Sequence, residues 1–365
     1  MLLCSMVPTM NKLLLLLLLV LPLAASAETS FVKLPMGHEI YVDHQAAKGD
    51  KATFVLVNGL VYDFSRWNEL AAKLESQGFG VVRYYFRGQQ KTLRRELEKG
   101  SPAFFRDGLS QANYAQELSE LLKQLKIEKG VIVGLSYGAG IAAEFAERYP
   151  QQVEQLTFLA PLVVSLDRYD PNGAWIQMNL AAMKIFWGPF WGQWAYDQYY
   201  DWIYRKYMAE RLGNDRIPAE MQDVAGTYKE TVFHQVRAMR DFDLRGYRFK
   251  DLAGRVNVIL ASGESEPALK DQFRAWSNFG AAQGSLIYLS PSFHAIPDSQ
   301  GAWAAELLAG LTTKDARLTR GQAYYSKPAS SWAGLEKAST NDLEGRALKE
   351  PRDGDQAAAK KGVSP

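Results

Sequence analysis

Five residues in the middle of the chain, Gly134-Leu135-Ser136-Tyr137-Gly138, place a serine between two glycines. The apolar run 131–133 precedes them, and the small residues of 139–143 follow, which predicts a strand before the serine and a helix after it. A sharp turn at this junction forces the residue at its tip into a strained conformation, and glycines on both sides let strand and helix approach closely. The pattern predicts that Ser136 presents its hydroxyl group as a nucleophile.

A serine nucleophile needs a base that takes its proton. The chain has four histidines. His38 and His44 belong to a predicted N-terminal hairpin, and His234 belongs to a long inserted region. His294 alone follows a late strand on a short loop, so we expect it to reach Ser136 as the base.

The base needs a carboxylate that orients it and stabilises its charged form. The turn 262–267 ends one predicted strand and begins a helix, and it carries Glu264 and Glu266. Glu266 is the first choice. Glu264 is the second, and Asp167, after the preceding strand, is the third. The chain order would be serine, acid, histidine.

Attack on a carbonyl group also needs two N–H donors for the oxyanion. One should be the backbone N–H of Tyr137, which directly follows the nucleophile. The other should come from a loop after an earlier strand, and Asn58-Gly59-Leu60 follows the predicted strand 53–57. The glycine allows a sharp turn there, so the N–H of Leu60 is the predicted second donor.

The elements that must position these residues alternate along the chain, which predicts an α/β protein with a doubly wound, mostly parallel sheet of about eight strands. A hairpin should open the fold, and helices should lie between most of the later strands. The expected strands are 31–34, 39–44, 53–57, 80–86, 131–135, 156–159, 256–261 and 285–289, and the expected helices are 67–77, 102–126, 141–148, 267–279 and 301–311.

One connection is much longer than a crossover requires, because roughly ninety residues separate the strands on either side of it. We therefore divide the chain into a first core part, 28–161, an inserted cap or lid, 162–250, and a second core part, 251–311. The cap is rich in aromatic residues, including Trp175, Trp187 and Trp191. The last segment, 312–365, is polar without sustained periodicity and is predicted to be a largely disordered tail.

The first 27 residues have the features of a secretory signal: Lys12, an apolar run, and small residues before a cleavage site after Ala27. This predicts a secreted or periplasmic protein. The single cysteine, Cys4, precedes the apolar run, so a lipid-modified cysteine is not expected. A formal net charge of +2 argues against nucleic acid as a partner. The sequence contains no evident metal cluster, phosphate-binding loop or nucleotide fingerprint, so we expect no metal and no cofactor.

The elbow 134–138, the Asn58-Gly59 loop, the turn 263–266 and His294, in this order and spacing, resemble the α/β-hydrolase fold superfamily over residues 31–311. The resemblance implies a cap after the sixth strand and an acid three residues after Gly263. It points to a serine esterase or lipase-like member, since the nucleophile is serine. Two departures are Asn58-Gly59, where many members have His-Gly, and the segment 84–92, where Tyr85 and Gln90 replace an aspartate and a glycine.

An aromatic cap over such a site implies an apolar substrate portion, with Trp175, Trp187 and Trp191 as candidate substrate-binding residues. The leading hypothesis is a serine hydrolase that cleaves an apolar carboxylic ester through an acyl-enzyme. One alternative is an aminopeptidase-like peptidase of the same fold. Another is a non-catalytic protein that binds an apolar ligand. The aromatic residues would also suit transient contact with a membrane surface.

Overall fold

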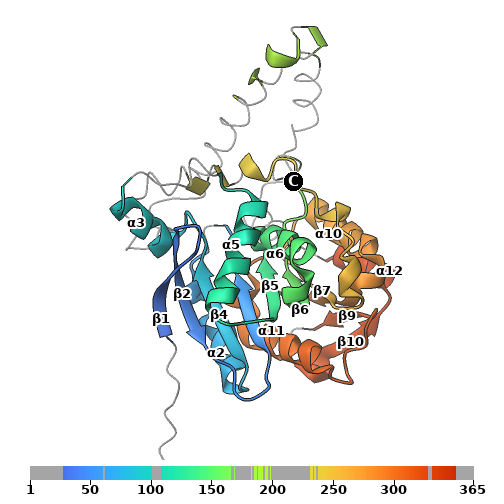
Figure 1. Cartoon of the computed structure of the whole chain (residues 1–365). Coiled ribbons are helices and arrows are strands. Elements are labelled where there is room, and N and C mark those ends of the chain that lie inside the picture. Colours follow the sequence, from blue (N-terminus) through green and yellow to red (C-terminus); the bar gives the residue numbers. More distant parts are fainter. Residues whose placement is uncertain are drawn as a thin grey trace, which may run out of the picture.

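The computed structural model describes residues 28–60, 62–100, 108–165, 237–327 and 331–350, with a minority of positions between 168 and 235. Its centre is one sheet of ten strands in the order β1-β2-β4-β3-β5-β6-β7-β8-β9-β10 (Figure 1). The strands are β1 (Glu28–Lys33), β2 (Glu39–Gln45), β3 (Thr53–Val57), β4 (Gly80–Tyr85), β5 (Gly130–Leu135), β6 (Val153–Leu159), β7 (Val256–Ala261), β8 (Gln283–Leu289), β9 (Ala323–Ser326) and β10 (Leu335–Ala338).

Neighbouring strands from β4 to β9 are parallel, and the antiparallel pairs lie at the two ends of the sheet. The described α-helices are α2 (Asn68–Ser76), α3 (Gln90–Glu98), α5 (Gln111–Gln124), α6 (Tyr137–Arg148), α10 (Glu266–Asn278), α11 (Ile296–Thr313) and α12 (Thr340–Ala347). Short 3₁₀ helices occupy Phe64–Trp67, Pro150–Gln152, Leu244–Gly246, Lys250–Leu252, Gly280–Ala282 and Trp332–Gly334. This architecture confirms the predicted α/β fold with a doubly wound, mostly parallel sheet.

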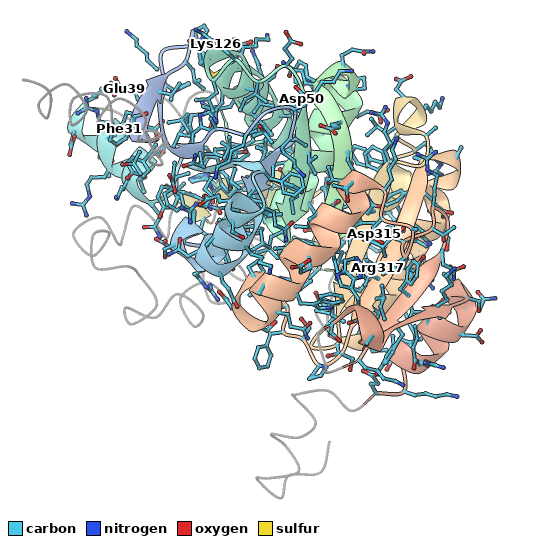
Figure 2. The ribbon with its side chains drawn as sticks, turned by 90° about the horizontal axis from the view of Figure 1, so that it is seen from below. Phe31, Glu39, Asp50, Lys126, Asp315 and Arg317 are labelled. Carbon is cyan, nitrogen blue, oxygen red and sulfur yellow. The ribbon has the colours of Figure 1, made fainter. Side chains whose placement is uncertain are left out.

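Helices cover both faces of the sheet because the strand residues alternate between two hydrophobic cores. In β3, Val55 and Val57 face the core shared with α5, α6, α10 and α12, whereas Phe54 and Leu56 face the core shared with α2 and α11. Figure 1 shows α5 and α6 in front of the sheet, and Figure 2, seen from below, shows α2 beside α11. Strands buried on both faces explain the continuous apolar runs in the sequence.

The eight predicted strands are all present, with ends that differ by a few residues, and the five predicted helices correspond to α2, α5, α6, α10 and α11. The prediction missed α3, a short helix rich in charged residues. It also extended the helix 102–126 too far toward the N-terminus: Ser110 caps α5, and its Oγ accepts a hydrogen bond from Asn113 N at 3.2 Å. The part of that helix at 102–107 lies outside the described residues.

The predicted disordered tail was wrong over the described residues 323–327 and 331–350. β9 and β10 extend the sheet by two strands, and α12 packs on the same face as α10. The carboxylate of Glu350 accepts hydrogen bonds from the hydroxyl groups of Tyr288, Ser290 and Tyr325, at 3.1, 2.7 and 2.7 Å. Four-residue strands carry too few residues to show a period, so the polar composition concealed them. Residues 351–365 lie outside the described part of the chain.

The long insertion leaves the sheet after β6 and returns before β7. Its two ends meet: Val164 and Asp243 form an isolated antiparallel bridge, and Leu244 N donates to Val163 O at 2.8 Å. Most of 166–230 lies outside the described residues. Among the helices that are described, none combines the length and apolar character needed to cross a bilayer.

Candidate active site

The predicted nucleophile lies at the strand-to-helix corner expected from the sequence. Ser136 joins β5 to α6 with φ 53° and ψ −114°, in the region of backbone space that non-glycine residues rarely adopt. A Cβ on Gly134 would lie 2.7 Å from Gly138 O, and a Cβ on Gly138 would lie 2.5 Å from both Val57 O and Asn58 O. Both glycines are therefore required by the close approach of α6 to β5 and to the end of β3.

His294 and a glutamate complete a chain of two hydrogen bonds. His294 Nε2 lies 2.8 Å from Ser136 Oγ, and His294 Nδ1 lies 2.6 Å from Glu264 Oε1. An ionised carboxylate only accepts hydrogen bonds, so Nδ1 carries the proton and Nε2 is left to accept from the Ser136 hydroxyl. This is the tautomer that a general base for serine needs.

The acid at this position is Glu264, so the first choice made from the sequence, Glu266, is corrected. Glu264 is 7% exposed, and Gln272 Nε2 also donates to its Oε1 at 3.3 Å. Glu266 is the first residue of α10, and its carboxylate pairs with Lys270 Nζ at 2.6 Å with half of its side chain exposed. The third choice, Asp167, lies outside the described residues.

The loops that carry Glu264 and His294 are joined by hydrogen bonds. Gly263 N donates to Ser292 O at 2.8 Å, and Ser292 N donates to Ser262 Oγ at 2.9 Å. These loops follow β7 and β8, which are adjacent parallel strands, so their carboxyl ends meet at the same edge of the sheet. The pairing of the two loops holds the acid and the base in one place.

The predicted oxyanion loop lies beside the nucleophile. A Cβ on Gly59 would lie 3.5 Å from Leu135 O, which is ordinary van der Waals contact, and the φ of Gly59 is outside the left-handed region. Neither a left-handed backbone nor a close contact therefore requires glycine at position 59. Within the described residues, neither the N–H of Leu60 nor that of Tyr137 donates a hydrogen bond.

Asp298, near the start of α11, connects the histidine loop with the segment that follows the oxyanion loop. Its Oδ1 accepts from Tyr62 OH at 3.2 Å and from Arg66 Nε at 3.1 Å. Burial, together with the Asp298 charge, raises the pKa of Tyr62 above its usual value, so its hydroxyl remains a donor. Burial likewise raises the pKa of Tyr137. Neither tyrosine adds charge to the site at neutral pH.

Sequence reasoning missed the polar side chains that support the oxyanion loop. Asn58 is fully buried: its Oδ1 accepts from Trp67 Nε1 at 2.8 Å, and its Nδ2 donates to Tyr84 O at 3.2 Å. Gln89 Nε2 donates to Gly59 O at 3.1 Å. Gln89 lies thirty residues after Gly59, within the segment 84–92 that departs from the α/β-hydrolase motif. That departure was the only sign in the sequence that this segment had a role of its own.

Of the predicted substrate-binding residues, Trp175 and Trp187 lie outside the described residues. Trp191 is described: it is 55% exposed, and its ring contacts Phe190 and Trp194 edge to face. In the part of the chain that the structure describes, no group of three or more histidine, cysteine, aspartate or glutamate side chains could hold a metal ion.

Known proteins share this fold. A family model described as the α/β hydrolase fold matches residues 52–201. Uncharacterized proteins of Mycobacterium bovis and Mycobacterium tuberculosis are each 31% identical over 119 residues, which is 33% of this chain and 32% of theirs. The match thus spans about a third of these relatives' length.

The similarity to solved structures covers more of the chain than the family model and the curated relatives do. An α/β hydrolase enzyme from a deep-sea metagenome is 18% identical, with coverage of 78% and 97% and a TM-score of 0.52. An esterase from Exiguobacterium antarcticum is 16% identical, with coverage of 78% and 100% and a TM-score of 0.52. An enol-lactonase from Burkholderia xenovorans is 18% identical, with the same coverage and a TM-score of 0.50. The chain therefore has the α/β-hydrolase fold.

Proposed function

We propose that the protein is a serine hydrolase that cleaves a carboxylic ester with an apolar portion through an acyl-enzyme. The observation that carries the proposal is the continuous path from Ser136 Oγ through His294 to Glu264, with contacts of 2.8 and 2.6 Å. It combines a nucleophile, a base and a charged orienting group in the geometry that acyl transfer requires.

In the first half of the reaction, Ser136 Oγ attacks the ester carbonyl carbon while His294 Nε2 takes the hydroxyl proton. The negative charge that develops on the carbonyl oxygen is stabilised by the N–H groups of Leu60 and Tyr137. The bond between the carbonyl carbon and the alcohol oxygen then breaks. The alcohol leaves with the proton from Nε2, and the acyl group stays on Ser136.

In the second half, water attacks the acyl carbon and gives a proton to His294 Nε2. The bond to Ser136 Oγ breaks, the serine regains that proton, and the carboxylic acid leaves. Glu264 accepts the Nδ1–H hydrogen bond throughout, which stabilises the imidazolium that forms in each half.

An apolar substrate portion is supported by exposed aromatic side chains. Phe293, which directly precedes His294, is 60% exposed, and Trp191 of the insertion is also exposed. Apolar side chains of this size favour the burial of an acyl or aryl group. The esterase and the enol-lactonase that share the fold agree with ester chemistry. Roles for Trp175 and Trp187 remain predictions from the sequence.

A fluorophosphonate probe on the purified protein tests the mechanism. We expect labelling of the wild type, none of Ser136→Ala, and strongly reduced labelling of His294→Gln. Labelling that persists in Ser136→Ala would refute the assignment of the nucleophile. A series of p-nitrophenyl esters of increasing chain length then tests the substrate class, and no hydrolysis of any of them would refute the proposal of an apolar ester.

We also propose secretion and transient contact of the insertion with lipid. Cleavage after Ala27 would leave Glu28, the first residue of β1, as the new N-terminus, and mass spectrometry of the exported protein tests this. Some of the described apolar side chains of the insertion are exposed: Ile185, Phe186, Phe190, Trp191 and Trp194. Aromatic rings favour the membrane interface. Co-sedimentation with phosphatidylcholine vesicles should weaken in Trp191→Ser, and equal binding would refute the contact.

A further inference from the structure

We propose that Gln89 is a positioning residue for the oxyanion hole: its side chain holds the peptide between Gly59 and Leu60 so that the N–H of Leu60 faces the oxyanion. The inference rests on the proposed function and deepens it. Gln89 is 1% exposed, and both ends of its amide contact the oxyanion loop. Nε2 donates to Gly59 O at 3.1 Å, and Oε1 accepts from Asn58 Nδ2 at 3.4 Å.

The orientation of this amide is determined by its neighbours. The indole N–H of Trp67 only donates, so the Asn58 atom 2.8 Å from it must be the carbonyl oxygen. The other end of Asn58 is then its NH₂ group, which donates to the Gln89 oxygen and to Tyr84 O at 3.2 Å. Gln89 is left with its own NH₂ group directed at Gly59 O. If the amide of Gln89 were flipped, its oxygen would face the oxygen of Gly59 and its NH₂ group would face the NH₂ group of Asn58, so both hydrogen bonds would be lost.

The orientation of the Gly59 carbonyl decides that of the Leu60 N–H. In a planar trans peptide the C=O and the following N–H point to opposite sides. A carbonyl held toward Gln89 therefore directs the Leu60 N–H away from Gln89. Gly59 itself lies against Leu135, the residue before the nucleophile. A peptide that follows glycine rotates easily, so an oxyanion donor at this position needs an outside contact to hold it.

The segment that carries Gln89 is itself held firmly. Gln89 N donates to Phe86 O at 3.1 Å, and Leu93 N donates to Gln89 O at 2.9 Å, which fixes Gln89 as the residue before α3. Arg87, two residues earlier, is buried and forms an ion pair with Glu117 of α5. A side chain that extends from so rigid a segment can hold a peptide in one orientation.

Gln89→Met tests the inference, with Gln90→Met as the matched control. Methionine keeps the length and bulk of glutamine but removes the donor. Gln90 is also fully buried, yet within the described residues its amide has no hydrogen-bond partner. On a p-nitrophenyl ester, with active sites counted by fluorophosphonate labelling, we expect Gln89→Met to lower kcat about tenfold or more with KM nearly unchanged. Gln90→Met should retain the wild-type kcat.

A second measurement separates positioning from general stability. Phenylboronic acid forms a tetrahedral adduct with a serine nucleophile and places an oxygen in the oxyanion hole. Its affinity should fall in Gln89→Met by about the same factor as kcat, roughly tenfold. A residue that only stabilises the fold would lower the unfolding temperature while leaving kcat per labelled site and boronate affinity unchanged, and that result would overturn the inference.

If Gln89→Met does not fold, Gln89→Glu replaces it. This variant keeps the shape and the contact with Asn58 but directs a carboxylate at Gly59 O, so the same loss of kcat is expected. Wild-type kcat in either folded variant overturns the inference and leaves the proposed function intact. A wild-type protein that neither reacts with fluorophosphonate nor hydrolyses esters refutes the proposed function itself, and the inference with it.

Discussion

Glu264 and Glu266 lie two residues apart, and the same substitution in each separates the triad acid from a surface carboxylate. Glu264→Gln keeps the shape of the side chain but removes the charge beside His294 Nδ1. We expect kcat per active site to fall by about 10³- to 10⁴-fold, as when a triad aspartate is neutralised. Glu266→Gln loses only an exposed pair with Lys270, and such pairs contribute about 0–1 kcal/mol to stability. Its kcat should stay near the wild-type value.

The magnitude follows from the charge that develops on His294. When Nε2 takes the serine proton, the imidazolium lies with Nδ1 2.6 Å from the carboxylate of Glu264. At an effective dielectric constant of about 20, two unit charges at this distance attract by about 6 kcal/mol. Because 48% of the His294 side chain is exposed, water screens part of this attraction. A remaining contribution of about 4–5 kcal/mol corresponds to the expected loss in kcat.

The assay is the hydrolysis of a short p-nitrophenyl ester, with thermal unfolding recorded for both variants. Unfolding within a few degrees of the wild type would show that Gln272 still holds the substituted side chain. The reasoning would be refuted if Glu266→Gln lost as much activity as Glu264→Gln, or if a folded Glu264→Gln retained the wild-type kcat.

Three further predictions concern the elements around the site. Gly138→Ala puts a methyl group 2.5 Å from Asn58 O, so both the activity and the unfolding temperature should fall. The control is Gly345→Ala, in a helix with open space around the residue, which should unfold at no lower temperature than the wild type. Burial, with the charge of the neighbouring carboxylate of Glu117, raises the pKa of Glu96 from 4.5 to about 8. The free energy of unfolding should therefore fall as the pH rises from 4.5 to about 8. In denaturant titrations across this range, Glu96→Gln should lose less stability than the wild type, with a difference of up to a few kcal/mol. Glu350→Ala removes the acceptor of three hydroxyl groups and should lower the free energy of unfolding by about 2–3 kcal/mol, with release of the C-terminal strands detected as faster hydrogen exchange.

Each of these has a contrary result. A Gly138→Ala protein with normal activity would mean that α6 can move away from the oxyanion loop at little cost. A Glu96→Gln protein that follows the wild-type pH dependence would place the titrating group elsewhere. Unchanged exchange in β9 and β10 after Glu350→Ala would mean that sheet pairing alone holds the extension.

The sequence was sufficient to predict the sheet because its strands are buried on both faces. Runs such as 131–133 and 258–261 are apolar without interruption, and the glycines of the elbow show where one of them ends. The extension 323–350 could not be predicted in this way. Its buried side chains include Tyr324 and Leu343, and the carboxylate of Glu350 accepts hydrogen bonds from the core. These scattered contacts leave no period in the sequence.

The support of the oxyanion loop was also beyond sequence reasoning. The Gln89 contact joins residues thirty positions apart, and a glutamine in a loop has no distinctive pattern. The choice between Glu264 and Glu266 was different, because a signal was present. Lys270 follows Glu266 by four residues, a spacing that predicts an exposed pair on a helix surface and thus favours the other glutamate as the acid.

The distances across the sheet explain why Glu264 is the acid. In the strand order β5-β6-β7-β8, three strand spacings, or roughly 14 Å, separate the strand before Ser136 from the strand before His294. Five residues after Leu289, an extended chain reaches about 17 Å, so the histidine loop must run back over the end of β7 to contact the serine. Glu264, three residues beyond the end of β7, lies on that path. Glu266 has already entered α10, which carries its side chain toward Lys270 and solvent.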